Sequence, residues 1–164
     1  MKNILLPKDY EYLAGLVNEL SNESKKLTKK LGEYAAHGGA VPFQIPEYQA
    51  TDDKLRSIKE RFIVINKLLK NSDVVTFEKI DDRVIGLYCF IKTEDQDTGF
   101  KDCFYIIHPE LADKIEFKDE TLPVSPKSPV GQALIGKKSG NVVKIKLPKT
   151  TKKLKIISFE KKEF

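Results

Sequence analysis

A chain of 164 residues can form one large domain or two small ones with a substantial core. Apolar residues make up 40% and charged residues 32%, as in an ordinary soluble globular protein, and no apolar run of about 18 residues could cross a membrane. Cys89 and Cys103 are isolated and lack CxxC spacing, which favours a reducing cytoplasm over a disulfide and argues against a metal site. We therefore expect a cytoplasmic protein.

The net charge of +5 is unevenly distributed along the chain. Between Pro126 and Phe159 there is no acid, but lysine recurs at Lys127, Lys137, Lys138, Lys144, Lys146, Lys149, Lys152, Lys153 and Lys155. A basic surface of this kind can face nucleic acid or an acidic protein. Because the stretch lacks arginine and interleaved aromatic residues, it does not indicate base recognition, and a simple solvated face is an equal alternative.

Two segments with helical periodicity predict an antiparallel hairpin over residues 1–75. Their apolar residues alternate at spacings of three and four, as in a coiled coil. These residues are Leu13, Val17, Leu20, Leu27, Leu31 and Tyr34, then Leu55, Ile58, Phe62, Ile65 and Leu69. We expect Asp9 to cap the first helix, which runs from about Lys8 to Ala36, and Pro46 to lie near the start of the second.

Residues 37–48 form the predicted tip of this hairpin. Two glycines and two prolines lie in this window, and neither residue type can continue a helix without cost. Phe43 and Ile45 would then be exposed at the tip, which is unusual for apolar side chains unless they contact a partner.

After Val74 the pattern changes to the period of two that is typical of strands. We expect strands over residues 74–77, 84–91, 103–107, 142–147 and 154–159, with a hairpin turn at 97–99. Ser128 as N-cap, Pro129 at the first helical position and Gly136 as the stop predict one short helix. The fold class is therefore α+β, with a strand-rich antiparallel domain over residues 76–164.

The chain has no self-contained set of catalytic residues. It lacks a glycine-rich phosphate loop, a nucleophile elbow and metal-ligand spacing. His37 and His108 fall near predicted element ends, where a lone histidine is usually a capping or surface residue. Asp52 and Asp53 fall in the predicted first turn of the second helix, where carboxylates favour the positive helix end. We therefore expect that the protein is not itself an enzyme and that it carries neither a cofactor nor a metal ion of its own.

The stretch SPKSPVGQALIGKKSG at residues 125–140 resembles the signature of the bacterial Gre transcription elongation factors. In that family a serine-proline pair opens a short helix that ends in a leucine-isoleucine/leucine-glycine-lysine run. The similarity extends back through residues 84–86, 97–99 and 105–113, and forward to Phe159 and Glu160. Together with the helical hairpin, it covers nearly the whole chain.

The resemblance implies an FKBP-like C-terminal domain that docks on bacterial RNA polymerase beside its secondary channel, while the coiled coil enters the channel. It also implies a monomer that meets nucleic acid only within the elongation complex. Ser128, Pro129 and Gly131, with Lys137 and Lys138, are the expected docking residues. In such factors two acidic residues at the tip help to hold a second Mg²⁺, so that the polymerase hydrolyses backtracked RNA.

The tip departs from the family pattern. His37-Gly38 and Glu47-Tyr48 match its two ends, but Gly39 stands at the aspartate position and no acid follows from Ala40 to Pro46. We therefore expect an apolar plug in the channel in place of a metal clamp, and any Mg²⁺ would belong to the polymerase. The plug residues are Gly39, Val41, Pro42, Phe43 and Ile45. The runner-up is a cleavage factor that uses Glu47 with Asp52 or Asp53.

Two alternatives come from other functional classes. A peptidyl-prolyl isomerase-like or generic protein-binding module is one, although isomerase pockets are lined by aromatic residues and the chain has no Trp. A direct nucleic-acid binder that uses the lysine-rich C-terminal hairpin is the other, and steep salt-dependent binding without polymerase would identify it.

Overall fold

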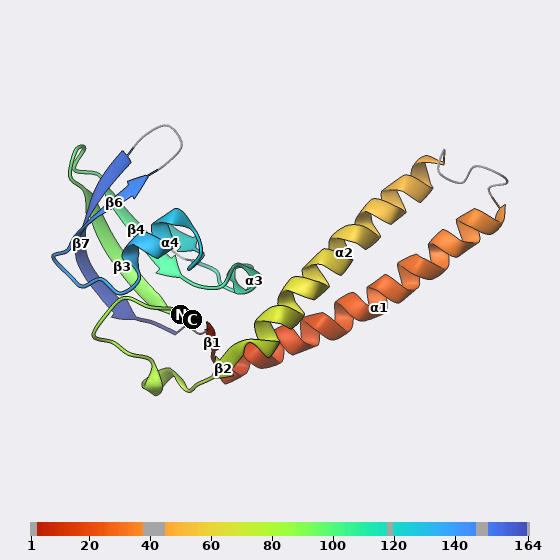
Figure 1. Cartoon of the computed structure of the whole chain (residues 1–164), viewed down its shortest axis with the longest axis horizontal. Coiled ribbons are helices and arrows are strands. Elements are labelled where there is room, and N and C mark those ends of the chain that lie inside the picture. Colours follow the sequence, from red (N-terminus) through yellow and green to blue (C-terminus); the bar gives the residue numbers. More distant parts are fainter. Residues whose placement is uncertain (1–2, 38–44, 118–119, 147–150, 164) are drawn as a thin grey trace. The chain divides into compact units, whose positions relative to one another are not determined.

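The computed structural model describes residues 3–37, 45–117, 120–146 and 151–163. The chain divides into two compact units, Met1–Val74 and Val75–Phe164 (Figure 1). Within the described residues, no helix is both long and apolar enough to span a membrane.

The first unit is an antiparallel pair of helices, α1 (Pro7–His37) and α2 (Pro46–Lys70), which pack side by side (Figure 1). Each helix begins at a proline, which suits the first position because the N–H that proline lacks would find no partner there. Asp9 is therefore not the cap we expected: it lies in the first turn, 4% exposed. At the other end of the hairpin, Asn71 closes α2 by donating its backbone N–H to Leu68 and Lys67.

The predicted apolar seams supply most of the hairpin core. Leu13, Leu20, Leu55, Ile58 and Ile65 are buried. Near the end of α2, however, Leu68 is buried and the predicted Leu69 is only half-buried. A helix with 3.6 residues per turn drifts against a 3.5-residue repeat, so the buried face moves by one position along the helix.

Two three-residue strands that the sequence did not predict join the ends of this unit. β1 (Asn3–Leu5) pairs in parallel with β2 (Ser72–Val74), with Leu5 opposite Val74. The strand expected over residues 74–77 is wrong, since β2 ends at Val74 and a 3₁₀ turn occupies Phe77–Lys79. Strands of three residues are too short to leave a clear period of two in the sequence.

The second unit is built on a five-stranded sheet with the order β5-β4-β3-β7-β6. Its strands are β3 (Cys89–Asp95), β4 (Lys101–Ile106), β5 (Thr121–Val124), β6 (Val142–Lys146) and β7 (Thr151–Lys161). The expected antiparallel arrangement holds for every neighbouring pair except β4 and β5, which run parallel. A crossover of a dozen or more residues, which includes helix α3 (Pro109–Ala112), makes this parallel pairing possible.

The strand expected over residues 84–91 begins only at Cys89. Tyr88 adopts a φ of 62°, in the left-handed region, and a strand cannot continue through that conformation. The backbone of Tyr88 donates to Ile106 and accepts from Lys162, both at 2.8 Å. Residues 84–88 are therefore a fixed loop, and Ile85 and Leu87 within it are buried in the core.

β3 pairs with β7 over its whole length, from Cys89 opposite Lys161 to Asp95 opposite Leu154. A bulge interrupts the pairing, because Lys92 faces Ser158 but Thr93 faces Ile156. Ile157 is thus the extra residue of β7, and its side chain is exposed. Helix α4 (Pro129–Leu134) packs near β6 and places Leu134, which is fully buried, in the core.

Two isoleucines of α2 give a direct test of the hairpin core. Ile65 is fully buried, whereas Ile63 is 63% exposed. We expect Ile65→Ala to lower the free energy of unfolding by about 2–4 kcal/mol, because it removes buried methylene groups and leaves a cavity. We expect Ile63→Ala to change it by less than about 0.5 kcal/mol. Urea denaturation followed by helical circular dichroism measures both, and equal losses would contradict the assignment of the core.

Candidate functional site

The start of helix α4 is fixed by the side chain of Ser128. Its Oγ accepts a hydrogen bond from the Gly131 N–H at 3.1 Å and donates one to the Ser125 carbonyl at 2.8 Å. Pro129 follows at the first helical position and is exposed. The predicted N-cap is confirmed, and the cap presents the Pro129 ring to solvent at the tightly held end of the helix.

Gly131 is required by a close approach of two backbone segments. A Cβ at this position would overlap the Ser125 carbonyl oxygen and come within 3.1 Å of the Pro126 Cα. Both obstacles are backbone atoms, so no side-chain rotation could relieve the contact. Gly131 is itself buried, and we conclude that its direct role is to let the 125–128 turn lie against α4.

The end of α4 is held by the loop that precedes β3. Gly136 adopts a φ of 77° and donates its N–H to the Ile85 carbonyl at 2.8 Å, and Ile85 donates back to Lys137 at 2.9 Å. The next turn is closed by Asn141, whose Oδ1 accepts the Lys138 N–H at 2.9 Å. The exposed Lys137 and Lys138 therefore stand on a well-ordered turn.

The structure thus brings the five predicted docking residues onto one short element and its flanks. Ser128, Pro129 and Gly131 lie in the cap and first turn, and Lys137 and Lys138 directly follow the helix. Because α4 has six residues, its length is only about 9 Å. The exposed members of the set can therefore meet one partner surface.

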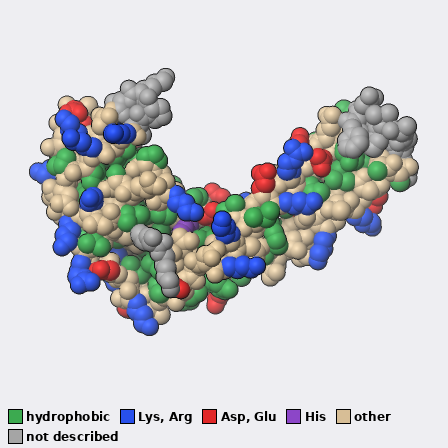
Figure 2. Space-filling model, viewed as in Figure 1, with side chains coloured by type: hydrophobic (Ala, Val, Ile, Leu, Met, Phe, Trp, Pro, Cys, Tyr) green, Lys and Arg blue, Asp and Glu red, His purple; other side chains and the backbone are tan. Residues whose placement is uncertain are grey.

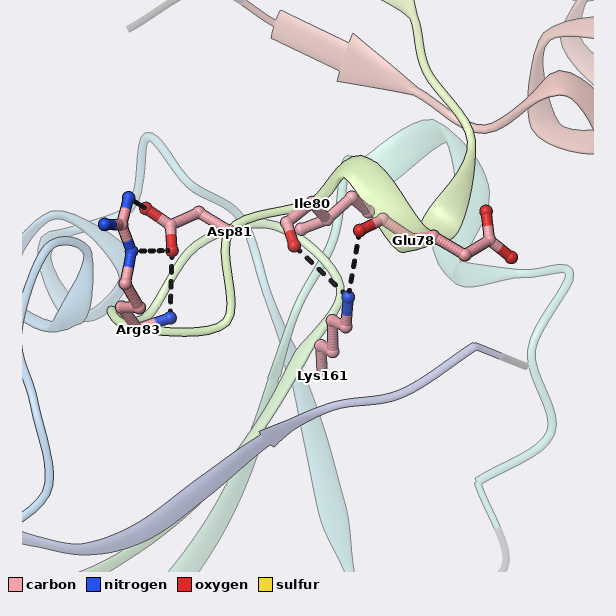
Figure 3. A network of polar contacts seen from close by, with 5 residues as sticks. All are labelled: Glu78, Ile80, Asp81, Arg83 and Lys161. Carbon is pink, nitrogen blue, oxygen red and sulfur yellow. Dashed lines mark hydrogen bonds and ion pairs between the residues drawn. The ribbon is translucent and has the colours of Figure 1, made fainter.

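A polar network that the sequence did not predict lies in the same unit (Figure 3). Arg83 donates to both carboxylate oxygens of Asp81, at 3.0 and 3.1 Å. These hydrogen bonds lower the pKa of Asp81 to about 2, and the charge of Lys138 contributes in the same direction. The sequence signal that could have predicted this ion pair is the Asp-x-Arg spacing, because it lets the two side chains meet within one turn.

In the same network, Lys161 holds the segment at residues 77–80, near the start of the sheet unit. Its Nζ donates to the carbonyl oxygens of Phe77, Glu78 and Ile80 at 3.3, 3.5 and 3.2 Å, and lies 5.2 Å from the centroid of the Phe77 ring. An ammonium has three protons to donate, so this geometry uses all of them. β7 therefore anchors the first turn of the sheet unit.

The three carboxylates predicted near the hairpin tip do not lie together in the described structure. Glu47 is in the first turn of α2, whereas Asp52 and Asp53 lie one to two turns further on, so the predicted position of this aspartate pair was wrong. The helix starts at Pro46, as expected, which leaves Asp52 and Asp53 beyond its first turn. Asp52 accepts a hydrogen bond from Arg56 at 3.2 Å, and both residues line a shallow hollow of about 280 Å³.

No group of three or more His, Cys, Asp or Glu side chains within the described ranges could hold a metal ion. Glu47, Asp52 and Asp53 therefore do not form a three-ligand metal site by themselves. Ile45, half-buried, precedes α2. The other expected plug residues, Gly39, Val41, Pro42 and Phe43, lie outside the described residues, so Ile45 is the one member of the plug that the structure describes.

The remaining candidate side chains have structural positions. His108 precedes α3 and is 3% exposed, so it is not a surface residue, and its side chain does not cap the helix. Cys89 and Cys103 are free thiols, and burial raises the pKa of Cys89.

Known proteins match the unit that carries α4 and also nearly the whole chain. The family model described as "Transcription elongation factor, GreA/GreB, C-term" matches residues 80–161. Transcription elongation factor GreA of Lachnoclostridium phytofermentans is 30% identical over 164 residues, which cover 98% of this chain and 96% of that protein. The GreA of Thermotoga maritima is 28% identical, with 96% and 97% covered. The solved GreA factor homolog 1 of Thermus thermophilus aligns at 20% identity over 98% of this chain and 99% of that chain, with a TM-score of 0.46.

The close approach at Gly131 can be tested by adding one methyl group. We expect Gly131→Ala to destabilise the sheet unit by roughly 1–3 kcal/mol, because the new Cβ meets backbone atoms that must move. Gly86→Ala in the same unit is the matched control, since nothing lies within 4 Å of its Cβ position. Thermal unfolding compares the two, and a Gly131→Ala variant as stable as Gly86→Ala would contradict the packing described here.

Proposed function

The chain belongs to the GreA/GreB family of transcription elongation factors, and we propose that it binds bacterial RNA polymerase and modulates elongation through the secondary channel of the enzyme. The observation that supports docking most directly is the start of α4. There the exposed Pro129 follows the Ser128 cap, and Gly131 leaves no room for a side chain beside the Ser125 and Pro126 backbone. A rigid element of this kind loses little conformational entropy on binding.

Family membership does not favour the alternatives of an isomerase-like module or a free nucleic-acid binder. In our proposal the chain acts in the cytoplasm as a monomer, meets nucleic acid only within the elongation complex, and is not itself an enzyme. It carries no cofactor of its own. Any Mg²⁺ that takes part in RNA hydrolysis is held by the polymerase.

We further propose that the tip acts by occupying the channel and does not recruit a second metal ion. Asp52 is already engaged by Arg56, and Glu47 lies on a different turn of α2 from Asp52 and Asp53. Carboxylates that hold one divalent ion must place their oxygens about 2.0–2.1 Å from it, and these three do not converge.

The docking proposal is tested by binding to core RNA polymerase. We expect Pro129→Ala to weaken binding about fivefold to tenfold, because it removes an exposed contact while alanine remains acceptable at the first helical position. Pro123→Ala, an exposed proline of β5 in the same unit, is the matched control and should bind like the wild type. Co-purification and labelled-protein titration measure both. Equal affinity of the two variants would remove Pro129 from the docking surface.

The tip proposal is tested on a stalled, backtracked elongation complex. We expect that saturating protein binds the complex without shortening its RNA. RNA shortening would instead support the cleavage alternative, and in that case Glu47→Gln should abolish the shortening, whereas Glu60→Gln on the same helix should not.

A further inference from the structure

The lysine-rich hairpin of β6 and β7 has an outer face that the docking of α4 does not explain. Lys144 lies directly opposite Lys153, and Lys146 and Lys155 lie two residues away on the same face. All four side chains are exposed. We call this face, together with Val142 and Ile157, the basic sheet face. Figure 2 shows that Lys and Arg outnumber acidic side chains on the visible surface of this unit.

Three lysines of this face form no ion pair with a described acid. Within the described part of the chain, no carboxylate oxygen lies within 4.0 Å of the ammonium groups of Lys144, Lys153 or Lys155. Glu94 faces Lys155 across β3, but the two form no ion pair. Like charges at directly opposite positions on neighbouring strands repel each other. The arrangement therefore costs stability in the free protein, and a partner with negative charge would remove that cost.

Protection of a sheet edge does not account for the pattern. Lysines on an edge strand do prevent unwanted strand pairing, and β6 is an edge strand. Lys153 and Lys155, however, lie on β7, which is paired on both sides by β6 and β3. Charges on an interior strand do not shield an edge, so edge protection accounts for the lysines of β6 but not for those of β7.

The exposed apolar side chains on this face point to a protein partner. Val142 is 53% exposed and Ile157, the bulged residue, is 44% exposed. Val142 is the pairing partner of Lys155, and Ile157 lies two residues beyond Lys155, so the two apolar side chains stand together at one end of the lysine cluster. Exposed apolar side chains beside charged ones are common at protein interfaces. Nucleic acid fits less well. The only three arginines are Arg56, Arg61 and Arg83, none on this face, and the ring of Phe90 on the neighbouring strand lies beneath the ammonium groups of Lys92 and Lys162.

We infer that the basic sheet face is a second docking surface, which binds an acidic patch beside an apolar one on RNA polymerase. This inference rests on the proposed function, because the polymerase is the partner that α4 brings within reach. Lysine side chains are long and strongly hydrated, so their contribution should be mainly to the rate of association and should weaken with salt.

Charge reversal of the opposed pair tests the inference. We expect Lys144→Glu/Lys153→Glu to lower the affinity for core polymerase about tenfold at about 50 mM salt, and by less at about 300 mM. Ile157→Ser should lower affinity at both salt concentrations. Lys79→Glu/Lys114→Glu makes the same charge change at exposed positions of the same unit outside the sheet, and should bind within about twofold of the wild type.

A single variant separates binding from folding. Lys144→Glu places an acid opposite Lys153, so its Tm should rise by about 2–5 °C while polymerase binding weakens. A loss of binding that is accompanied by a lower Tm in this variant would count against the inference, because it would report damage to the sheet.

The outcomes distinguish the two proposals. If Pro129→Ala weakens binding and the charge reversal behaves like its control, the second surface is wrong and the proposed function stands. If the wild-type chain does not bind polymerase at all, both are wrong. If the wild type binds a free 20-nucleotide strand or duplex near physiological salt and the charge reversal abolishes this, the face recognises phosphate, which overturns the assignment to an acidic protein surface.

Discussion

The pairing of β3 with β7 is the interaction on which the sheet unit depends. It joins residues 59 to 72 positions apart in the chain. The rest of the sheet extends from this pair: β4 pairs with β3, β5 pairs with β4, and β6 pairs with β7. The Tyr105 hydroxyl donates to the Lys162 carbonyl at 2.7 Å, and Lys161 holds three carbonyls of the 77–80 segment. The end of β7 is therefore also where the first turn of the unit is fixed.

This arrangement gives α4 a rigid support. The helix is short, and a six-residue helix has little stability of its own. Its shape comes from the Ser128 cap, the close approach at Gly131 and the hydrogen bonds between Ile85 and residues 136–137. The same unit carries the basic sheet face on β6 and β7, so two surfaces with different chemistry belong to one rigid framework.

Features set by local chemistry were predictable from the sequence. The Ser128-Pro129 start of α4 and the two-helix hairpin followed from capping and periodicity. The turn at 97–99 is confirmed too: Asp95 Oδ1 accepts from the N–H groups of Asp97 and Thr98, and Gly99 has a φ of 72°.

Features set by distant parts of the chain were not predictable. β5 contains Pro123, which a strand usually avoids, and only its place at a sheet edge allows it. The left-handed Tyr88 looks in sequence like part of an apolar strand. In the candidate site, the capping pattern predicted Ser128 and Pro129. The close backbone approach that requires Gly131, and the contacts of Lys161, could not be predicted because they join segments that meet only in the fold.

The short β1–β2 pair has a consequence for the motion of the hairpin. It joins the two chain segments at the end of the hairpin away from the tip, where Leu5, Leu13 and Ile65 are all fully buried. Beyond Leu20, none of the described side chains of α1 is buried, although the helix continues to His37. The free energy of local opening should therefore decrease along the hairpin, with slow amide exchange at the joined end and rapid exchange toward residues 37 and 45. Local opening should therefore begin in the helical turns near residues 37 and 45, while the end joined by β1 and β2 stays closed.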